Sequence, residues 1–350
     1  MTVFTSPEFD NHEQVVFCAD ADSGLRAIIA IHNTNLGPAL GGCRMWPYAD
    51  DEEALRDALR LARGMTYKSA ITGLPYGGGK SVIIGDPKTL KSEALLRAMG
   101  RFVDSLGGRY QTAEDVGTTV ADMDILRQET EYAHGLSGSS GDPSPATAYG
   151  VFMGIRAALY FKHERDDLRG LTVAVQGLGN VGKRLCRYLA DAGTRLVVAD
   201  INEDAMQAAI RDFGATPVSP NDIHKVEADV FAPCALGAIL NDKSIPELSA
   251  NIVAGSANNQ LAGPQHGEAL RKRGVLYAPD YVINAGGLID IYVGEEGGNQ
   301  EAVLKRTAEI YQTTLTILER AAREESATDA IADSMAEERF RDRRSCRVAA

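Results

Sequence analysis

Two lysines and an aspartate in the first half of the chain have side chains that could carry out acid–base chemistry. Lys80 follows three glycines at positions 77–79, Lys68 lies twelve residues earlier, and Asp115 follows Glu114. If folding partly buries both ammonium groups beside Asp115, each positive charge disfavours the other and burial disfavours both, so the pKa values of the lysines fall. A lysine with a lowered pKa can act as a general acid and base near neutral pH, whereas one at about 10.4 cannot. The other lysine can stay charged and bind a carboxylate.

The second half of the chain contains a pattern typical of dinucleotide binding. An apolar run at residues 171–176 leads into Gly177-Leu178-Gly179-Asn180-Val181-Gly182, and a second apolar run at 195–199 ends at Asp200, 23 positions after Gly177. In such a unit the first glycine permits a tight turn, the second lets the backbone approach the pyrophosphate, and the third lets the helix pack on the strand. We expect Asp200 to accept hydrogen bonds from the adenosine ribose. Its carboxylate would repel a 2′-phosphate, so the pattern favours NAD over NADP.

The glycine-rich segment before Lys80 is not a phosphate-binding loop. That motif requires glycine at position 74, where this chain has leucine, and the segment leads into an expected strand at residues 81–84 instead of a helix. We interpret the three glycines as positions that remove side chains from the wall beside Lys80. A ligand and a nicotinamide ring could then come close to the backbone and to the ammonium group. Lys68 shares a helix face with Met65 and Gly64, and would point inward if the apolar stripe of that helix does.

The elements that must position these residues change character near the middle of the chain. In the first half we expect strands at 14–18, 25–31, 81–84 and 109–112, and helices from 51 to before 73, over 92–106, and from a capping box at Thr119 to near His134. Residues 135–146 are rich in glycine, serine and proline, which marks a domain boundary. After a helix at 147–162, strands at 171–176, 195–199, 228–231, 251–254 and 275–278 alternate with helices, and helices over 300–323 and 327–342 follow.

The sequence therefore predicts an α/β protein with an N-terminal mixed α/β substrate domain, a Rossmann-type doubly wound dinucleotide-binding domain after it, and a cleft between them. Two domains are also the natural expectation for 350 residues. We place the substrate, catalytic and oligomerisation domain at 1–145 and the NAD-binding domain at 146–325. A C-terminal helix at about 326–350 is expected to return to the first domain.

Composition excludes several classes of function. Hydrophobic residues at 44% and charged residues at 24% are ordinary for a soluble globular protein, and a formal net charge of −12 argues against nucleic-acid binding. No apolar run is long enough to span a membrane. Five scattered cysteines without a CxxC pair favour reduced thiols in the cytoplasm, and neither they nor the six dispersed histidines predict a metal site. We interpret the arginine-rich end, residues 339–347, as a solvated helix end or a subunit contact.

At this point eight segments, in order, carry a resemblance that covers nearly the whole chain. They are LGPALGGCR (36–44), GMTYKSA (64–70), GGGK (77–80), TAEDVG (112–117), GDPSP (141–145), APCALG (232–237), GSANNQ (255–260) and YAPDYVINAGG (277–287). Together they resemble the Glu/Leu/Phe/Val dehydrogenase family, and within it most closely the branch that acts on leucine.

The resemblance implies reversible oxidative deamination, in which an L-amino acid loses hydride to NAD, the imine takes up water, and ammonia leaves a 2-oxo acid. By matching position, Lys80 corresponds to the general acid and base that activates the attacking water. Lys68 corresponds to the lysine that binds the α-carboxylate, and Asp115 to the carboxylate that handles the proton of the amine. Asn258 would help to fix the α-carboxylate, and Asn284 would help to shape the cofactor and substrate site.

The resemblance also implies the lining of the site. The substrate side comprises Leu40, Gly41, Gly42, Met65, Ala113, Leu288 and Ile291, and the nicotinamide side comprises Thr147, Ala235, Asn258 and Asn284. A second carboxylate on the substrate would need a cation, because an unpaired buried charge is costly. The apolar positions therefore favour leucine, isoleucine and valine over glutamate.

Alternatives remain at this stage. Gly79 stands where leucine-specific members often carry alanine and aromatic-specific members carry glycine, which keeps phenylalanine or tryptophan open as the substrate. A protein that senses NAD without turnover is a more distant alternative. The implied partners are the amino acid, its 2-oxo acid and ammonia, with no nucleic acid and no membrane. The family's assemblies lead us to expect a homo-oligomer between a dimer and an octamer.

Overall fold

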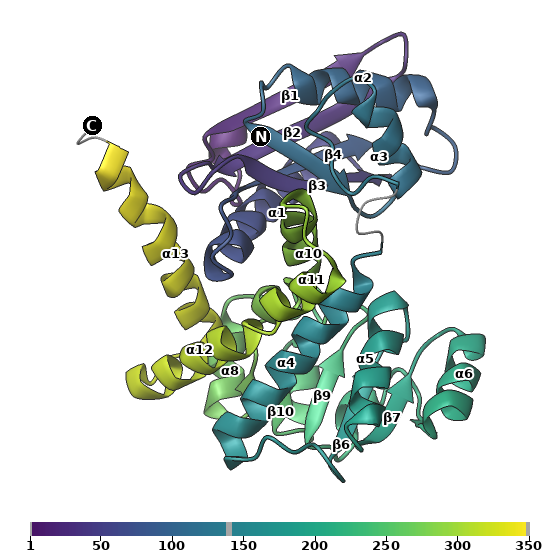
Figure 1. Cartoon of the computed structure of the whole chain (residues 1–350), viewed down its shortest axis with the longest axis vertical. Coiled ribbons are helices and arrows are strands. Elements are labelled where there is room, and N and C mark those ends of the chain that lie inside the picture. Colours follow the sequence, from purple (N-terminus) through teal and green to yellow (C-terminus); the bar gives the residue numbers. More distant parts are fainter. Residues whose placement is uncertain (1, 138–141, 348–350) are drawn as a thin grey trace. The chain divides into compact units, whose positions relative to one another are not determined.

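The structure, a computed structural model, describes residues 2–137 and 142–347, with side chains as far as residue 341 (Figure 1). The chain forms two compact units. Unit 1 comprises Met1–Gly141 together with Ala336–Ala350, and unit 2 comprises Asp142–Met335. In the described residues, no helix is long and apolar enough to cross a membrane.

Unit 1 is built on a mixed five-stranded sheet in the order β1-β2-β4-β3-β5. Its strands are β1 (Gln14–Asp20), β2 (Leu25–Asn33), β3 (Ala39–Trp46), β4 (Gly77–Ile84) and β5 (Tyr110–Glu114). β2 pairs antiparallel with β1 and with β4, whereas β3 runs parallel to both β4 and β5. Because parallel strands end at the same edge, this arrangement places the carboxyl ends of β3, β4 and β5 together.

Helices cover both faces of this sheet. Helix α1 (Asp51–Ile71) buries an alanine-rich stripe against the β2 and β4 residues Ile28, Ala30 and Val82. Its N-cap is Asp50, whose side chain accepts a hydrogen bond from the backbone N–H of Glu53. Helices α2 (Glu93–Asp104) and α3 (Val120–Arg127) pack on the opposite face, around the fully buried ring of Tyr110. The capping box expected at Thr119 is present, with Asp122 as its second member.

Two expectations for unit 1 were wrong. Helix α3 ends at Arg127 instead of near His134, because the following residues lie alongside β5: the N–H of Thr112 donates to Tyr132 O and the N–H of His134 donates to Thr112 O. Strand β3 was not expected at all, since Gly41 and Gly42 lie in its middle and glycine is disfavoured in strands. The expected strand at 81–84 is confirmed, but it begins earlier, at Gly77.

The end of the chain contributes to unit 1 through helix α13 (Thr328–Arg347). Phe340 packs edge-on against Tyr67, with 5.5 Å between the ring centroids. Arg339 donates hydrogen bonds to the carbonyls of Ala70 (2.8 Å) and Ile71, so it caps the C-terminus of α1. The rest of the arginine-rich end lies outside the residues whose side chains are described.

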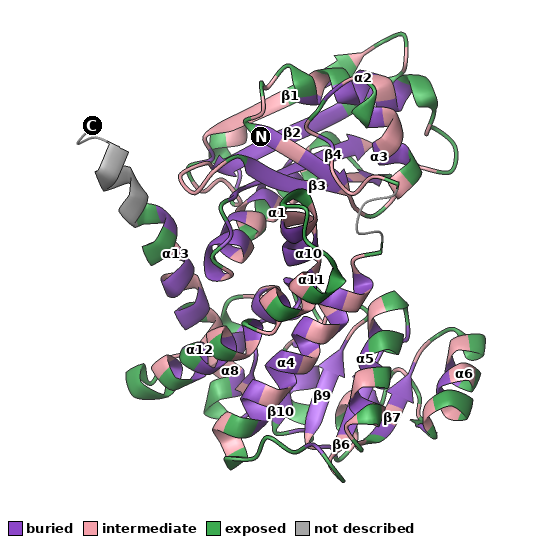
Figure 2. Cartoon of the chain, in the orientation of Figure 1, coloured by how far each residue is buried: buried purple, intermediate pink, exposed green. Residues whose placement is uncertain are grey.

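Unit 2 is a doubly wound domain on a six-stranded parallel sheet, in the order β11-β10-β9-β6-β7-β8. The strands are β6 (Thr172–Gln176), β7 (Arg195–Ala199), β8 (Thr216–Pro217), β9 (Val230–Pro233), β10 (Ile252–Val253) and β11 (Leu276–Tyr277). Strands β9 and β10 are buried throughout (Figure 2). The parallel sheet and these buried strands confirm the predicted fold class, because continuous apolar strands are typical of a sheet covered on both faces.

The helices of unit 2 are α4 (Ser144–His163), α5 (Asn180–Asp191), α6 (Glu203–Phe213), α7 (Ser244–Glu247), α8 (Gln265–Lys272), α9 (Asp280–Ile283), α10 (Gly286–Glu295), α11 (Gln300–Thr307) and α12 (Ile310–Glu324). Helix α4 precedes β6, helices α5 to α8 lie between strands, and helices α9 to α12 follow β11. The prediction of a single helix over 300–323 was wrong, since this segment forms two helices, α11 and α12, separated at residues 308–309. Helix α10, absent from the sequence-based expectation, begins where Gly286 packs against the backbone of Ala146 in α4.

Unit 1 also contains a buried pair of histidines. The rings of His12 and His32 meet edge to face with 4.8 Å between their centroids, and His32 Nδ1 bonds Thr66 Oγ1 at 2.8 Å. Burial lowers the pKa of His32 to about 4 and lowers that of His12 as well, although Asp10 opposes both shifts. Both rings are therefore neutral at pH 7 in the folded protein.

This pair predicts a loss of stability in mild acid. In the unfolded chain a histidine takes up a proton at about pH 6.5, whereas folded His32 does so only near pH 4, so stability is full above the first value and falls as the pH drops towards the second. For His32 the loss should reach about 2 to 3 kcal/mol by pH 4.5. Urea unfolding of the parent and of His32→Gln, from pH 7.5 to 4.5, measures it. The variant should lose the His32 part of this dependence; equal slopes for both proteins would contradict the prediction.

Candidate active site

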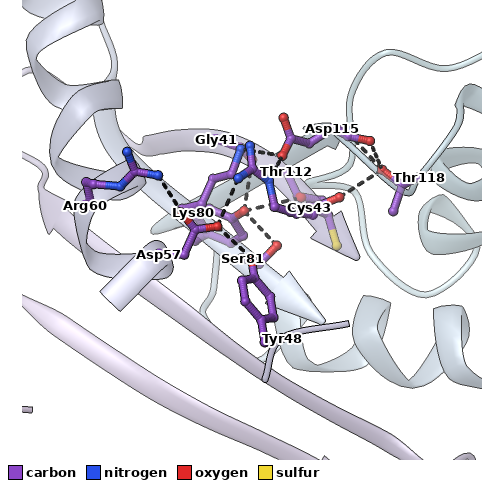
Figure 3. A network of polar contacts seen from close by, with 12 residues as sticks. Gly41, Cys43, Tyr48, Asp57, Arg60, Lys80, Ser81, Thr112, Asp115 and Thr118 are labelled. Carbon is purple, nitrogen blue, oxygen red and sulfur yellow. Dashed lines mark hydrogen bonds and ion pairs between the residues drawn. The ribbon is translucent and has the colours of Figure 1, made fainter. Parts of the chain in front are cut away.

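In unit 1 the structure brings Lys80 and Asp115 into direct contact. Lys80 lies in β4 and Asp115 follows the last residue of β5, and the ammonium nitrogen is 3.0 Å from Oδ2 of the carboxylate (Figure 3). The side chain of Lys80 is 6% exposed and that of Asp115 is 22% exposed. A nearly buried amine beside a carboxylate that keeps some access to solvent is an arrangement that can exchange protons with a bound substrate.

A second cation, Arg44 of β3, contacts the same oxygen. Its Nε donates to Asp115 Oδ2 at 2.8 Å, and its Nη1 donates to Asp57 Oδ2 of α1 at 2.9 Å. Burial by itself would raise the pKa of Asp115, but the charges and hydrogen bonds of Lys80 and Arg44 outweigh burial and lower that pKa. Asp115 is therefore a carboxylate throughout the neutral pH range.

The glycines at 41 and 42 make this contact sterically feasible. A Cβ on Gly42 would lie 2.7 Å from the Cβ of Asp115 and 3.2 Å from the ammonium nitrogen of Lys80. A Cβ on Gly41 would lie 1.7 Å from the carbonyl oxygen of Gly79, so β3 and β4 are packed backbone to backbone there. Gly42 thus stands beside the side chains of the Lys80–Asp115 pair, whereas Gly41 packs against the backbone of β4.

Our interpretation of the three glycines before Lys80 was wrong. A Cβ on Gly77 would meet the carbonyl oxygen of Asn33 at 2.0 Å, and one on Gly78 would meet the backbone nitrogen of Thr66 in α1 at 2.0 Å. A Cβ on Gly79 would lie 2.7 Å from the ring of Tyr110. These positions are filled by the protein itself, so the glycines let α1 and a buried ring approach β4 instead of leaving room for a ligand.

Lys68 and Met65 lie on α1 beside its buried stripe, and not within it. Both are half-buried, and Gly64 on the same side of the helix is exposed, whereas the buried positions include Ala62, Thr66 and Ser69. The direction of the Lys68 side chain stays a prediction. Its position leaves the side chain at the border between the covered face and solvent, where a long amine can contact a carboxylate.

Leu40 and Ala113 belong to the same sheet as Lys80 and are buried, at 1% and 5% exposure. Ala113 lies directly opposite Gly42 in the parallel pairing of β3 with β5. Because side chains alternate along a strand, Leu40 shares with Gly42 and Arg44 one face of β3, the face that α1 covers. The two apolar side chains expected to line a substrate pocket in unit 1 therefore lie on the same side of the sheet as the ion pair.

In unit 2 the glycine-rich turn joins β6 to α5. Gly177 has φ +96°, a conformation that other residues rarely adopt, and a Cβ on Gly182 would lie 2.0 Å from the carbonyl oxygen of Gly177. A Cβ on Gly179 would meet nothing within 4 Å, and Asn180 and Val181 after it are at least partly exposed. The turn thus needs its first and third glycines for its own packing, and leaves the second open towards the N-terminus of α5.

Asp200 lies at the end of β7, close to this turn. Its Oδ2 accepts a hydrogen bond from the N–H of Leu178 at 2.5 Å, and its Oδ1 accepts one from the N–H of Asn202 at 2.8 Å. Each bond uses one lone pair, so each oxygen keeps acceptor capacity for a ribose hydroxyl. The contact with Leu178 fixes the carboxylate beside the glycine-rich turn.

Two amide side chains form the other polar feature of unit 2. Asn284 Nδ2 donates to Asn258 Oδ1 at 2.8 Å and to Ser256 O at 3.1 Å. Asn284 Oδ1 and Gln176 Oε1 are both buried and have no hydrogen-bond partner among the described residues. Both oxygens can therefore accept a hydrogen bond from an N–H or O–H group of a ligand.

The remaining predicted positions of unit 2 lie on three segments. Thr147, in the first turn of α4, donates from Oγ1 to Pro143 O at 3.1 Å, and a Cβ on Gly287 would lie 3.1 Å from the same Oγ1. Ala235 is exposed and lies over Gly177. On α10, Leu288 is buried and Ile291 is half-buried.

These features test whether unit 2 fits a dinucleotide. The open position at Gly179, the uncapped N-terminus of α5, the carboxylate of Asp200 and the two unpaired acceptors each match a part of NAD: pyrophosphate, ribose and carboxamide. The residues therefore fit the cofactor. With the acid–base pair of unit 1, fold and site define a dinucleotide-dependent dehydrogenase.

Comparison with known proteins identifies the family. Residues 12–132 match the model "Glu/Leu/Phe/Val dehydrogenase, dimerisation domain", and residues 138–205 and 198–338 match the model "Glutamate/Leucine/Phenylalanine/Valine dehydrogenase". Leucine dehydrogenase of Geobacillus stearothermophilus is 56% identical over 350 residues, which cover 99% of this chain and 95% of that protein. L-tryptophan dehydrogenase of Nostoc punctiforme is 50% identical over 341 residues, which cover 97% and 96% of the two chains.

A solved structure agrees with these sequence matches. The crystal structure of L-tryptophan dehydrogenase from Nostoc punctiforme superposes with a TM-score of 0.84 at 49% identity, over 95% of this chain and 97% of that chain. The chain belongs to the Glu/Leu/Phe/Val dehydrogenase family, and it is an NAD-dependent amino acid dehydrogenase. The predicted family is thus confirmed.

Sequence reasoning assigned no role to Arg44 or Asp57. The sequence signal that could have revealed Arg44 was its charge directly after an apolar segment with two glycines. We did not expect this stretch to be a strand. A charged residue inside a buried strand needs a partner of opposite charge. That partner, Asp57, lies on a helix whose register the sequence did indicate, but the link between the two residues requires the tertiary structure.

The packing of Gly79 predicts the effect of the alanine that leucine-specific relatives often carry there. Tyr110 is fully buried and its hydroxyl bonds Gly41 O (2.9 Å) and Ser81 Oγ (3.0 Å), so its ring cannot move aside cheaply. Gly79→Ala should therefore destabilise the protein by about 1 to 3 kcal/mol. The ratio of kcat/KM for leucine to that for phenylalanine should stay unchanged, because the clash is internal. Urea unfolding and steady-state kinetics measure the two effects.

The matched control is Gly64→Ala on α1, where a Cβ would meet nothing within 4 Å. This change should leave stability unchanged or increase it by up to about 1 kcal/mol, because alanine is the better helix former. If Gly79→Ala proved as stable as the parent, or changed substrate preference strongly, the structural explanation of Gly79 would be wrong.

Proposed function

We propose that the enzyme catalyses the reversible oxidative deamination of a branched-chain L-amino acid, leucine above all, to its 2-oxo acid, ammonia and NADH. The observation that carries this proposal is the Lys80–Asp115 pair, a nearly buried amine held 3.0 Å from a carboxylate on a sheet face shared with apolar side chains. High identity to leucine dehydrogenases supports the substrate class.

Each catalytic side chain has a stated task in this proposal. Lys68 binds the α-carboxylate of the substrate. Asp115 takes the proton from the substrate ammonium, so that the carbon–nitrogen bond can become an imine. Bound NAD supplies the hydride acceptor. Lys80 then removes a proton from the water that attacks the imine carbon, and returns it as ammonia leaves.

The apolar pocket positions support a branched-chain substrate. Leu40 and Ala113 in unit 1 are buried and uncharged, so these two positions offer no cation to a second carboxylate on the substrate. An aromatic substrate is the second candidate, favoured by 50% identity to an L-tryptophan dehydrogenase. Gly79 gives this candidate no further support, because the ring of Tyr110 already accounts for the glycine.

The cofactor contacts are proposed as follows. The turn from Gly177 to Gly182 and the N-terminus of α5 bind the pyrophosphate, and Asp200 binds the adenosine ribose. Thr147, Ala235, Asn258 and Asn284 are assigned to the nicotinamide end. The negative charge of Asp200 accounts for a preference for NAD over NADP.

We further propose that residues 1–145 serve substrate binding, catalysis and assembly, and that residues 146–325 bind NAD. The family model that matches residues 12–132 is described as a dimerisation domain, which supports a homo-oligomer. Cys18, Cys43, Cys186 and Cys234 are free thiols, which supports a reducing compartment such as the cytoplasm. Cys346 lies outside the described side chains.

A substrate and cofactor panel tests the proposed specificity. Leucine, isoleucine and valine should lie within about 10 to 200-fold of one another in kcat/KM, because one methylene in an apolar pocket discriminates only that much. Glutamate should be worse than leucine by about 10² or more, and NADP worse than NAD with each substrate. A higher kcat/KM for phenylalanine or tryptophan would establish the aromatic alternative. No NADH formation with any L-amino acid would favour the sensor.

Substitution of the acid–base pair tests the mechanism. Lys80→Ala should lower kcat by about 10² to 10⁴-fold, because it removes the general acid and base, while the Kd for NADH stays unchanged. Asp115→Asn should act similarly. Lys91→Ala is the matched control: it breaks an ion pair of unit 1 with a shorter contact, 2.7 Å to Asp122, away from the proposed chemistry. Lys91→Ala should keep the parent kcat, and an active Lys80→Ala enzyme would contradict the mechanism.

A further inference from the structure

We infer that Arg44, held in place by Asp57, is a positioning residue that orients the carboxylate of Asp115 for catalysis and keeps it paired while Lys80 gains and loses its proton. The inference rests on the proposed role of Asp115 and adds a residue that the mechanism above does not use. It is carried by the geometry of Arg44 between two carboxylates, one on each side.

Arg44 uses two different nitrogens to bind the two carboxylates. Arg44 donates through Nε to Asp115 Oδ2 at 2.8 Å and through Nη1 to Asp57 Oδ2 at 2.9 Å. The side chains of Arg44, Asp115 and Asp57 are 20%, 22% and 13% exposed, so the contacts are largely shielded from water. A guanidinium is planar and rigid, and two carboxylates fix both its position and its plane.

The two oxygens of Asp115 have different contacts. Oδ2 contacts both Lys80 and Arg44, whereas Oδ1 accepts no hydrogen bond or ion pair from the described part of the chain. Arg44 and Lys80 therefore both contact Oδ2, and Oδ1 is left to a ligand. In the proposed reaction Oδ1 is the atom that takes the proton of the substrate ammonium.

The charge of Lys80 changes during the proposed catalytic cycle, whereas that of Arg44 does not. Lys80 must become neutral when it gives up its proton, and at that moment it no longer compensates the charge of Asp115. A guanidinium stays protonated in proteins, so Arg44 supplies a permanent positive charge at the same oxygen. Without it, the shielded carboxylate would be uncompensated in every state in which Lys80 is neutral, which is costly.

Asp57 is built to hold Arg44. Its Oδ2 also accepts a hydrogen bond from the hydroxyl of Tyr48 at 2.6 Å, and its Oδ1 contacts Arg60 at 2.8 Å. Burial would raise the pKa of Asp57, but the bonds from Tyr48 and Arg60 and the charge of Arg44 lower it. Figure 3 shows Arg60 and Asp57 on the side of Lys80 away from Thr118, and Tyr48 below the cluster. Positive and negative groups thus alternate from Lys80 to Arg60.

Other titratable groups near Asp115 do not compete with Arg44 for this role. Cys43 precedes Arg44 in β3, and burial raises its pKa to about 11. Burial likewise raises the pKa of Tyr110 in β5 and of Tyr48, which also donates to Asp57. All three side chains are neutral between pH 5 and 9, so Lys80 and Arg44 are the cations that contact Asp115 among the described residues.

The experiment compares pH profiles of kcat/KM for leucine between pH 5 and 10. Arg44→Gln removes the permanent charge, so Asp115 should take up a proton at higher pH, and the acid limb of the profile should move upward by about 1 to 3 pH units. The KM for NAD should stay unchanged. Arg44→Lys keeps the charge but not the fixed plane, so its acid limb should remain near that of the parent while kcat falls.

Two further variants make the result decisive. Arg26→Gln breaks an exposed arginine–aspartate pair, 2.6 Å from Asp51, and should leave the profile unchanged. Asp57→Asn leaves Arg44 charged but without its second charged partner, so kcat should fall while the acid limb stays near that of the parent, as for Arg44→Lys. It decides the question if Arg44→Gln fails to fold. Folded Arg44→Gln with the parent's acid limb, or Asp57→Asn with the parent's kcat when Arg44→Gln does not fold, would overturn the inference.

The Asp115→Asn variant separates this inference from the proposed function. If Asp115→Asn retains the parent kcat, the proposed role of Asp115 fails, and the inference about Arg44 fails with it. If Asp115→Asn is inactive but the acid limb of Arg44→Gln is that of the parent, the proposed function stands and only the inference about Arg44 is wrong.

Discussion

The contact of two cations with one carboxylate oxygen, Asp115 Oδ2, is the constraint on which the structure of unit 1 depends. Charges that are largely shielded from water must be compensated within the protein, and here Lys80 comes from β4 and Arg44 from β3. The two strands must therefore lie side by side with no side chain between the charged groups. The parallel pairing of β3 with β4 and the glycine at position 42 meet this requirement.

The same constraint explains why this sheet is so rich in glycine. Glycine weakens a strand, yet β3 has two and β4 begins with three. Each occupies a position where a Cβ would collide with protein atoms: Gly41 with β4, Gly78 with α1, and Gly79 with Tyr110. The cost in strand propensity is offset by close approach of β3, β4 and α1, which shields the ion pair from water and so strengthens its electrostatics.

How far the sequence predicted the molecule depends on how local each signal is. The turn from Gly177 to Gly182, the strands around it and Asp200 lie within one βαβ unit, and the pattern indicated all of them. Strand β3 was missed because its glycines hide the alternation of side chains. Arg44 and Asp115 are 71 residues apart, and their contact follows from the pairing of β3 with β5, which no spacing in the sequence encodes.

The polar groups around Asp115 in unit 1 and those at Gln176 and Asn284 in unit 2 are satisfied in different ways. In unit 1 the charged groups around Asp115 bind one another, so the acid–base geometry is set before any ligand arrives. In unit 2 the buried oxygens of Gln176 and Asn284 have no partner among the described residues, and an unpaired buried acceptor costs about 1 to 3 kcal/mol. A cofactor that donates hydrogen bonds to both oxygens removes that cost. The acid–base site of unit 1 is thus preorganised for chemistry, whereas the two oxygens of unit 2 gain hydrogen bonds when such a cofactor binds.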